Sequence, residues 1–126
     1  MQNEIEVDYN GQTFEVKFPN NREYVRIQNL KSILASNYES LQYIGTEGSF
    51  AEMIVDAEAH LTVMCPKLVK SLNVPIGDLS LVDMKTLTAL YAEKIRPWYN
   101  ECLNFIFGVD KKKISLETTE TTTIVE

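Results

Sequence analysis

Two short segments near the start of the chain alternate between apolar and polar residues. They flank an Asn10-Gly11 pair, and their apolar positions are Ile5, Val7, Tyr9, Phe14, Val16 and Phe18. Successive side chains of a strand point to opposite faces, so this spacing predicts two strands, each with one apolar face. Asn-Gly favours a type I′ turn, because that turn needs positive φ at both central residues. We therefore predict an antiparallel hairpin that packs on later elements, since a lone hairpin is marginal in water.

Apolar residues then recur at every third or fourth position, which is typical of amphipathic helices. The first such stretch covers residues 22–35 and follows the Pro-Asn-Asn of residues 19–21, which ends the second strand and can cap a helix. We interpret residues 36–48 as a loop, with a short helix inside it left open. Ser49 is predicted to cap the next helix, because Glu52 three residues later completes a capping-box pattern.

Two prolines interrupt the second half of the helical pattern. Pro66 either breaks a helix or starts another, since proline is tolerated in a first helical turn. Ser80 resembles a cap, and a long apolar stripe then runs to Gly108, the predicted C-terminal stop. The members of this stripe are Met84, Leu87, Tyr91, Ile95, Trp98, Cys102 and Phe105. Pro97 lies within the stripe and removes a backbone hydrogen bond, so we expect a kink or a break near residues 93–96.

The separation of strands and helices along the chain predicts an α+β fold. We expect an N-terminal antiparallel β-hairpin packed on a bundle of three or four helices, forming one domain over residues 1–108. Residues 109–126 form a polar segment with few apolar residues, so we expect a flexible, disordered tail. A second interpretation of this tail follows from its threonines and Ile124-Val125, which favour a strand added to the sheet of a partner.

The formal net charge of −6 makes the protein acidic. An acidic surface repels phosphate, so we expect no nucleic-acid partner. The sequence has no run of about 18 apolar residues, so we expect no membrane partner either. The first residues lack the basic and apolar regions of a secretory signal, which predicts synthesis in the cytoplasm. Cys65 and Cys102 lie in helical apolar patterns, where two buried thiols are expected in preference to one disulfide.

Candidate catalytic chemistry is sparse. His60 is the single histidine and has no fixed acid or nucleophile partner in the sequence, so we interpret it as structural. His60, Cys65 and Cys102 lack the close ligand pairs of zinc sites, so we predict no metal. Asp56 and Glu58 are interpreted as residues of a solvated helix face. We predict no cofactor and no enzymatic activity.

Arg96, Trp98 and Tyr99 are the candidate partner-binding residues. Arginine, tryptophan and tyrosine are enriched among interface residues whose loss weakens binding most. Trp98 lies on the apolar stripe and is equally well explained as a core residue. Tyr99 lies off that stripe, so we expect it at the surface.

The chain resembles the small tail assembly chaperones of long-tailed bacteriophages. The resemblance rests on the hairpin of residues 5–18, on Cys65-Pro66-Lys67-Leu68 with the following residues 73–79, and on the segment 94–99, Lys-Ile-Arg-Pro-Trp-Tyr. It implies a non-enzymatic protein that binds tape-measure and tail-tube proteins during virion morphogenesis in the host cell cytoplasm. A homo-oligomer is left open.

Three other functions remain open from the sequence. The first alternative is a structural virion component, such as a connector, ring or other head–tail subunit, which would place the chain in the virion. The second is a small regulatory protein that binds a host protein. The third is a small enzyme, which would require a cluster of titratable residues in one pocket.

Overall fold

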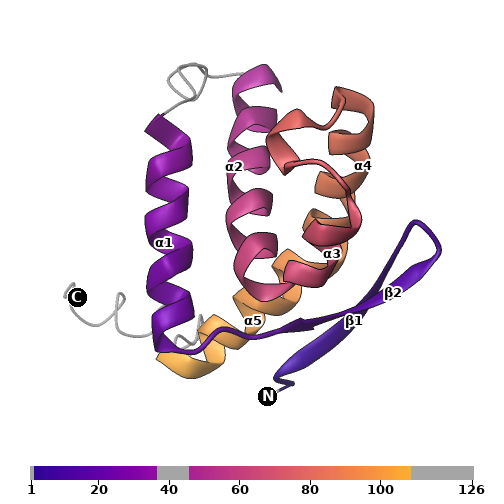
Figure 1. Cartoon of the computed structure of the whole chain (residues 1–126). Helices are drawn as coiled ribbons and strands as arrows, with labels where there is room; N and C mark the ends of the chain where they lie inside the picture. The colour runs from indigo at the N-terminus through magenta and orange to yellow at the C-terminus, as the bar shows by residue number, and fades with distance from the viewer. Residues whose placement is uncertain (1, 37–45, 109–126) are drawn as a thin grey trace.

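The computed structural model describes residues 2–36 and 46–108, with side chains described over 2–36 and 50–108. A two-stranded antiparallel hairpin precedes a set of helices, so the predicted α+β class is confirmed. Figure 1 shows α1 (Asn21–Ser36) beside α2 (Thr46–Met64), with α3 (Pro66–Ser71) and α4 (Leu81–Leu90) on the other side of α2. The tail predicted over residues 109–126, including its alternative strand, lies outside the described residues.

The hairpin consists of β1 (Glu4–Tyr9) and β2 (Gln12–Lys17), paired from Glu4 opposite Lys17 to Tyr9 opposite Gln12. Asn10 and Gly11 have φ values of 50° and 77°, as the predicted type I′ turn requires. The buried residues of its apolar face are Val7, Tyr9, Phe14 and Val16. The hairpin therefore packs on the helices as the alternating pattern predicts.

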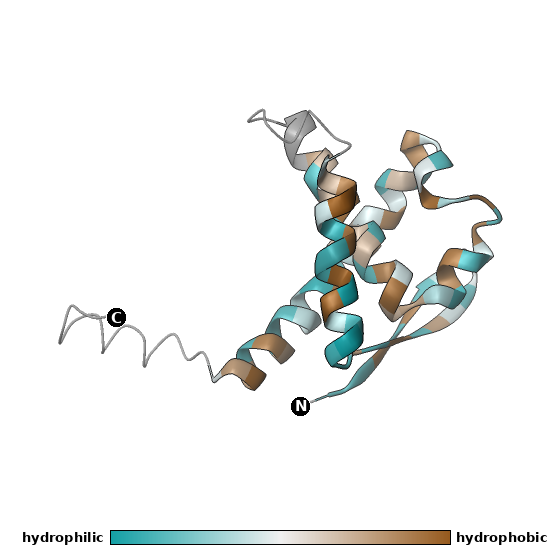
Figure 2. Ribbon diagram, turned by 60° about the vertical axis from the view of Figure 1, so that its left-hand side comes forward, coloured by the Kyte–Doolittle hydropathy of each residue, from teal (hydrophilic) through white to brown (hydrophobic). Residues whose placement is uncertain are grey.

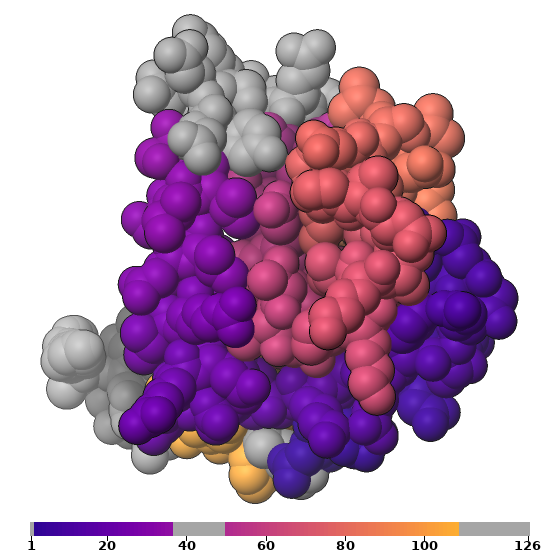
Figure 3. Space-filling model, viewed as in Figure 1, coloured from indigo at the N-terminus to yellow at the C-terminus, as the bar shows by residue number. Residues whose placement is uncertain are grey.

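Helix α1 begins one residue earlier than predicted, at Asn21, with Asn20 as its cap. The Asn20 side chain accepts a hydrogen bond from the backbone N–H of Glu23 at 2.9 Å. In return, the Glu23 carboxylate accepts one from the backbone N–H of Asn20 at 2.9 Å. This reciprocal pair is a capping box and fixes the start of the helix. Figure 3 shows α1 and α2 side by side on one face of the molecule, with the hairpin at the edge.

Helix α2 begins at Thr46, so the predicted start at Ser49 is wrong, and residues 46–48 belong to the helix rather than to a loop. The cost of Gly48 inside a helix is about 1 kcal/mol, which tertiary packing can outweigh. The other residues of the predicted loop, 37–45, lie outside the described range. Most of the side chains described over residues 50–64 of α2 are buried, including Ala51, Val55, Ala57, Ala59, Leu61 and Val63. The helix is therefore the centre of the core.

Pro66 starts a new helix, α3, in the first-turn position that proline tolerates. A short 3₁₀ turn, η2 (Ile76–Asp78), then leads to α4. Ser80 caps α4 as predicted, accepting a hydrogen bond from the backbone N–H of Asp83 at 3.1 Å.

The long C-terminal helical pattern is interrupted where Pro97 predicts a break. Residues Tyr91–Ile95 form a π-helical segment, η3, between α4 and α5 (Arg96–Phe107). The backbone N–H of Arg96 donates to the carbonyl of Tyr91, five residues earlier, which is the π-helical spacing. Pro97 has no N–H to donate, so the α-helical ladder cannot continue unbroken through this turn. Gly108 ends α5 with φ of 64°, as its predicted C-terminal position requires.

Candidate functional site

A buried carboxylate lies at the point where α1, α2 and the π-helical segment meet. Asp56 of α2 is only 8% exposed. Its carboxylate accepts a hydrogen bond from the Tyr91 hydroxyl at 2.7 Å, and Lys31 Nζ of α1 lies 3.0 Å from it. Arg96 Nε, at the start of α5, lies 3.5 Å from the same carboxylate. Four segments of the chain are therefore joined by one acidic side chain.

His60 lies one helical turn after Asp56, and its ring is almost fully buried. Its Nδ1 is 2.7 Å from the Asp56 carbonyl oxygen. A carbonyl oxygen can only accept, so Nδ1 carries the proton and donates it. In the neutral ring Nε2 is then an acceptor, and this atom has no hydrogen-bond partner among the described residues. The Tyr99 hydroxyl, whose ring centroid lies 4.6 Å from that of His60, is likewise buried and unpartnered within the described part of the chain.

Burial and charge set the protonation states of this group. Burial alone would raise the pKa of Asp56, but the Tyr91 hydrogen bond, His60 and Lys31 outweigh burial and lower that pKa. Burial lowers the pKa of His60, against the opposing effect of its bond to Asp56. Burial and the Asp56 carboxylate raise the pKa of Tyr91. Burial, with smaller effects of Tyr24 and Asp56, raises the pKa of Tyr99 to about 12. At neutral pH the group therefore holds an ionised Asp56 beside a neutral His60 and neutral tyrosines.

A cavity of about 300 Å³ adjoins this group. Its lining combines residues of α1, α2, the π-helical segment and α5, among them Gln28, Lys31, Asp56, His60, Arg96 and Tyr99. We call it the Asp56 cavity. Cations, an acid and amides line one volume, so it has the polar groups needed to bind and orient a small charged group.

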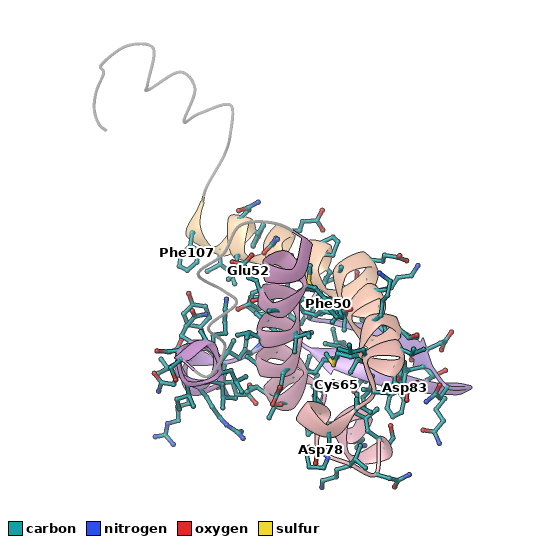
Figure 4. The ribbon with its side chains drawn as sticks, turned by 90° about the horizontal axis from the view of Figure 1, so that it is seen from above. Phe50, Glu52, Cys65, Asp78, Asp83 and Phe107 are labelled. Atoms are coloured by element: carbon teal, nitrogen blue, oxygen red, sulfur yellow. The ribbon has the colours of Figure 1, made fainter. Side chains whose placement is uncertain are left out.

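A second feature lies at the other end of α5. Phe105, Ile106 and Phe107 are 68%, 49% and 63% exposed, and together we call them the α5 terminal patch. Figure 2 shows the C-terminal end of α5 extending beyond the helical body, with apolar residues at its tip. Figure 4 shows Phe107 at the tip of α5, far from Cys65 and Asp83. Ile106 and Phe107 line a groove of about 320 Å³, together with Phe18, Pro19, Tyr24 and Leu103 among others. Phe105 lines a different hollow, beside Trp98 and Cys102.

The three predicted partner-binding residues are adjacent in sequence but occupy different environments. Trp98 is 8% exposed and donates its Nε1–H to the Gln2 carbonyl at 2.8 Å, so it is a core residue. Tyr99 is 3% exposed, so the expectation that it lies at the surface is wrong. It faces His60 and Phe18, which cover it. Arg96 is partly exposed and borders the Asp56 cavity. Their role in partner binding stays a prediction.

The sequence interpretation of two other features is revised by the structure. Asp56 was expected on a solvated helix face, and it is buried because α1 and η3 cover that side of α2. A signal was present in the sequence, since Asp56 and His60 are four residues apart and therefore share one face of the helix. The α5 terminal patch was also missed, because Phe105 continues the apolar stripe that is buried at Trp98 and Cys102. Cys65 and Cys102 are both buried and free, as expected.

Comparison with known proteins identifies no relative of this chain. No family model, no curated protein and no solved structure matches this chain. Within residues 2–36 and 46–108, no helix is both long and apolar enough to cross a membrane. The described residues also hold no group of three or more histidine, cysteine, aspartate and glutamate side chains placed to bind a metal ion.

Proposed function

We propose that this protein is a non-enzymatic phage tail assembly chaperone that binds tape-measure and tail-tube proteins through the α5 terminal patch. The observation that carries the proposal is the exposure of three consecutive apolar residues, Phe105, Ile106 and Phe107. Contiguous exposed apolar residues on a water-soluble domain mark sites of protein interaction. The resemblance of the sequence to tail assembly chaperones supplies the identity of the partners.

The chemistry of the patch suits a helical partner. Its adjoining groove is lined by the aromatic rings of Phe18 and Tyr24 and by aliphatic Leu103. An amphipathic helix binds such a groove by inserting apolar side chains spaced three or four residues apart. A tape-measure protein is long and helical, so it offers many segments of this kind. Covering them would keep the partner from aggregating while the tail is built.

The charge of the chain supports the same function. A net charge of −6 keeps a protein with an exposed apolar surface soluble and opposes its self-association. Specificity then comes from the shape and apolar character of the patch rather than from charge pairing.

Affinity purification from the phage-producing cells, read by mass spectrometry, tests the proposal. The tagged wild-type chain should recover the tape-measure protein and the tail-tube subunit. Phe105→Ser combined with Phe107→Ser should lower that recovery more than about tenfold, because truncating a central aromatic contact costs about 2 kcal/mol or more.

The matched control is Leu81→Ser combined with Val82→Ser. These two residues are 71% and 77% exposed and start α4, away from the patch. Recovery should stay at the wild-type level in this control. Equal recovery by both double variants, or equal loss from both, would show that the α5 terminal patch is not the binding site for these partners. Recovery of capsid, portal or connector proteins in place of the tape-measure protein would favour the structural virion component instead.

A further inference from the structure

The Asp56 cavity plays no part in the chaperone binding proposed for the α5 terminal patch. It lies between α1, α2 and the start of α5, and its volume of about 300 Å³ is at the lower end of the range for small-ligand sites. Tyr91, the first residue of the π-helical segment Tyr91–Ile95, lines the cavity, and so does Arg96, the residue that directly follows the segment. Single π-helical turns of this kind are frequent at functional sites.

The charges around the cavity do not balance. Lys31 and Arg96 each bring one positive charge, and Asp56 brings one negative charge, which leaves one positive charge in excess. His60 adds none at neutral pH, because burial keeps it in the neutral form. The cavity therefore favours a group with a single negative charge. A doubly charged phosphate fits less well, because Asp56 repels the second charge.

Several hydrogen-bonding groups at the cavity remain unused. Arg96 reaches Asp56 through Nε at 3.5 Å, which is long for an N···O contact, and the Met53 sulfur, a weak acceptor, through Nη1 at 3.6 Å. Its other N–H donors have no partner among the described residues. His60 Nε2 and the Tyr99 hydroxyl are buried without a partner in that same part of the chain. Buried polar atoms are nearly always hydrogen-bonded, so these two atoms, in residues that line one cavity, mark a polar site. The Tyr99 hydroxyl can donate to a carboxylate oxygen, whereas His60 Nε2 carries no proton and needs a donor on the occupant, such as a hydroxyl.

We propose that the Asp56 cavity binds a carboxylate group, with Arg96 as its principal ligand. The planar guanidinium of arginine presents paired N–H donors that match the two oxygens of a carboxylate. Lys31 adds a second positive charge beside the same volume. The carboxylate belongs either to a small monoanionic molecule or to an acidic side chain of a protein partner. The cavity shares Tyr24 and Leu103 with the groove beside the α5 terminal patch, but Lys31, Asp56 and Arg96 line the cavity alone. The carboxylate site is therefore tested independently of the chaperone proposal.

Nuclear magnetic resonance titration of the full chain tests this site with four probes. Sodium lactate represents a free carboxylate with a hydroxyl, and lactamide is its uncharged control. N-acetyl-glutamate amide represents an acidic side chain, and N-acetyl-glutamine amide is its uncharged control. Tyr99 and Asn100 both line the cavity. Saturable shifts of their backbone amides should appear with a carboxylate probe and be absent with its amide control.

Two variants identify the ligand residue. Arg96→Gln should weaken carboxylate binding by at least about tenfold, because it removes a charge-assisted hydrogen bond. Arg26→Gln removes the same type of side chain from an exposed position of α1 outside the cavity and should leave binding unchanged. A response to lactate alone would identify a free molecule as the source, and a response to the glutamate probe alone would identify a partner side chain. No saturable response to either carboxylate, an equal response to the amide controls, or an equal effect of both variants would overturn the proposal.

Discussion

Tyr91 donates its hydroxyl hydrogen to the Asp56 carboxylate at 2.7 Å, and the two residues are 35 positions apart in the sequence. Both side chains are buried, and the bond joins the π-helical segment to the central helix α2. Lys31 and Arg96 approach the same carboxylate from α1 and α5. The charged group inside this small domain is therefore a structural junction as well as the wall of a cavity.

Replacing Tyr91 with phenylalanine should destabilise the protein by about 1.5–3 kcal/mol. The change keeps the ring but removes a hydrogen bond to a charged group, which leaves the buried carboxylate less well satisfied. Urea unfolding followed by circular dichroism measures the effect. Tyr24→Phe is the control, because the Tyr24 side chain is only half-buried and its hydroxyl has no hydrogen bond among the described residues. A loss below about 0.5 kcal/mol in Tyr91→Phe would show that the bond contributes little to stability.

Trp98→Ala should cost about 3–5 kcal/mol of unfolding free energy, as large-to-small changes in a core do. The indole is buried, contacts Phe18 edge-on at 6.0 Å between ring centroids, and bonds to the Gln2 carbonyl. Phe105→Ala, on the same side of α5 but 68% exposed, should change stability by less than about 0.5 kcal/mol. Chemical denaturation of the two variants distinguishes them. If Trp98→Ala instead keeps its stability but binds the partner less well, Trp98 is an interface residue and not a core residue.

Stability should fall as the pH is lowered from 7 to 5, and His60 should contribute to this fall. The pKa of His60 is depressed in the folded protein from its ordinary value of 6.5, so the unfolded chain binds more protons below that pH. The contribution of neutral His60 to the unfolding free energy is complete above pH 6.5, and it is lost as the pH falls towards the pKa of His60 in the folded protein. Each unit by which the pKa is depressed corresponds to about 1.4 kcal/mol. Thermal unfolding of wild type and His60→Gln across this range is the measurement.

Asp56 acts in the same direction at lower pH. Its folded pKa is lowered from 3.8, so its contribution is present above that value and is lost as the pH falls further. The contributions of His60 and Asp56 to stability can thus be distinguished, because each is lost in a different pH range. An unchanged slope between pH 5 and 7 in His60→Gln would contradict the assignment of that window to His60.

Gly11→Ala should destabilise the hairpin by about 1–2 kcal/mol. Gly11 has φ of +77°, where a side chain is strained, although no atom of the described residues lies within 4 Å of an added Cβ. The matched control is Gly77→Ala in the 3₁₀ turn, which has equally open space but no positive φ. That change should be neutral or stabilising by up to about 1 kcal/mol, because it restricts the unfolded chain. Equal effects of the two substitutions in urea unfolding would show that backbone conformation is not the cause.

The features that the sequence predicts correctly are those decided by neighbouring residues. The Asn10-Gly11 turn, the Ser80 cap and the Gly108 stop each depend on the conformation of one or two residues and on bonds within a single turn. The break before Pro97 also follows from local chemistry, since proline lacks an N–H. Such features need no knowledge of what packs against them.

The features that the sequence does not predict depend on which segments come together. Asp56 would be solvated on an isolated helix, and it is buried because α1 and the π-helical segment meet over it. Tyr99 lies off the apolar stripe, yet His60 and Phe18 cover it. Phe105 lies on the stripe, yet it is 68% exposed near the end of α5, which extends beyond the helical body (Figure 2). Helical periodicity gives the apolar face of a helix but not how far along it the neighbours reach.

The most direct test of the proposed function is quantitative mass spectrometry of purified phage particles, compared with extracts of the cells that produce them. An assembly chaperone leaves its client when the tail is complete. We therefore expect the protein to be abundant in the extract, in complex with the tape-measure protein, and to be absent from the finished particle. Many fixed copies in every purified particle would contradict the chaperone account and identify the chain as a structural component of the virion.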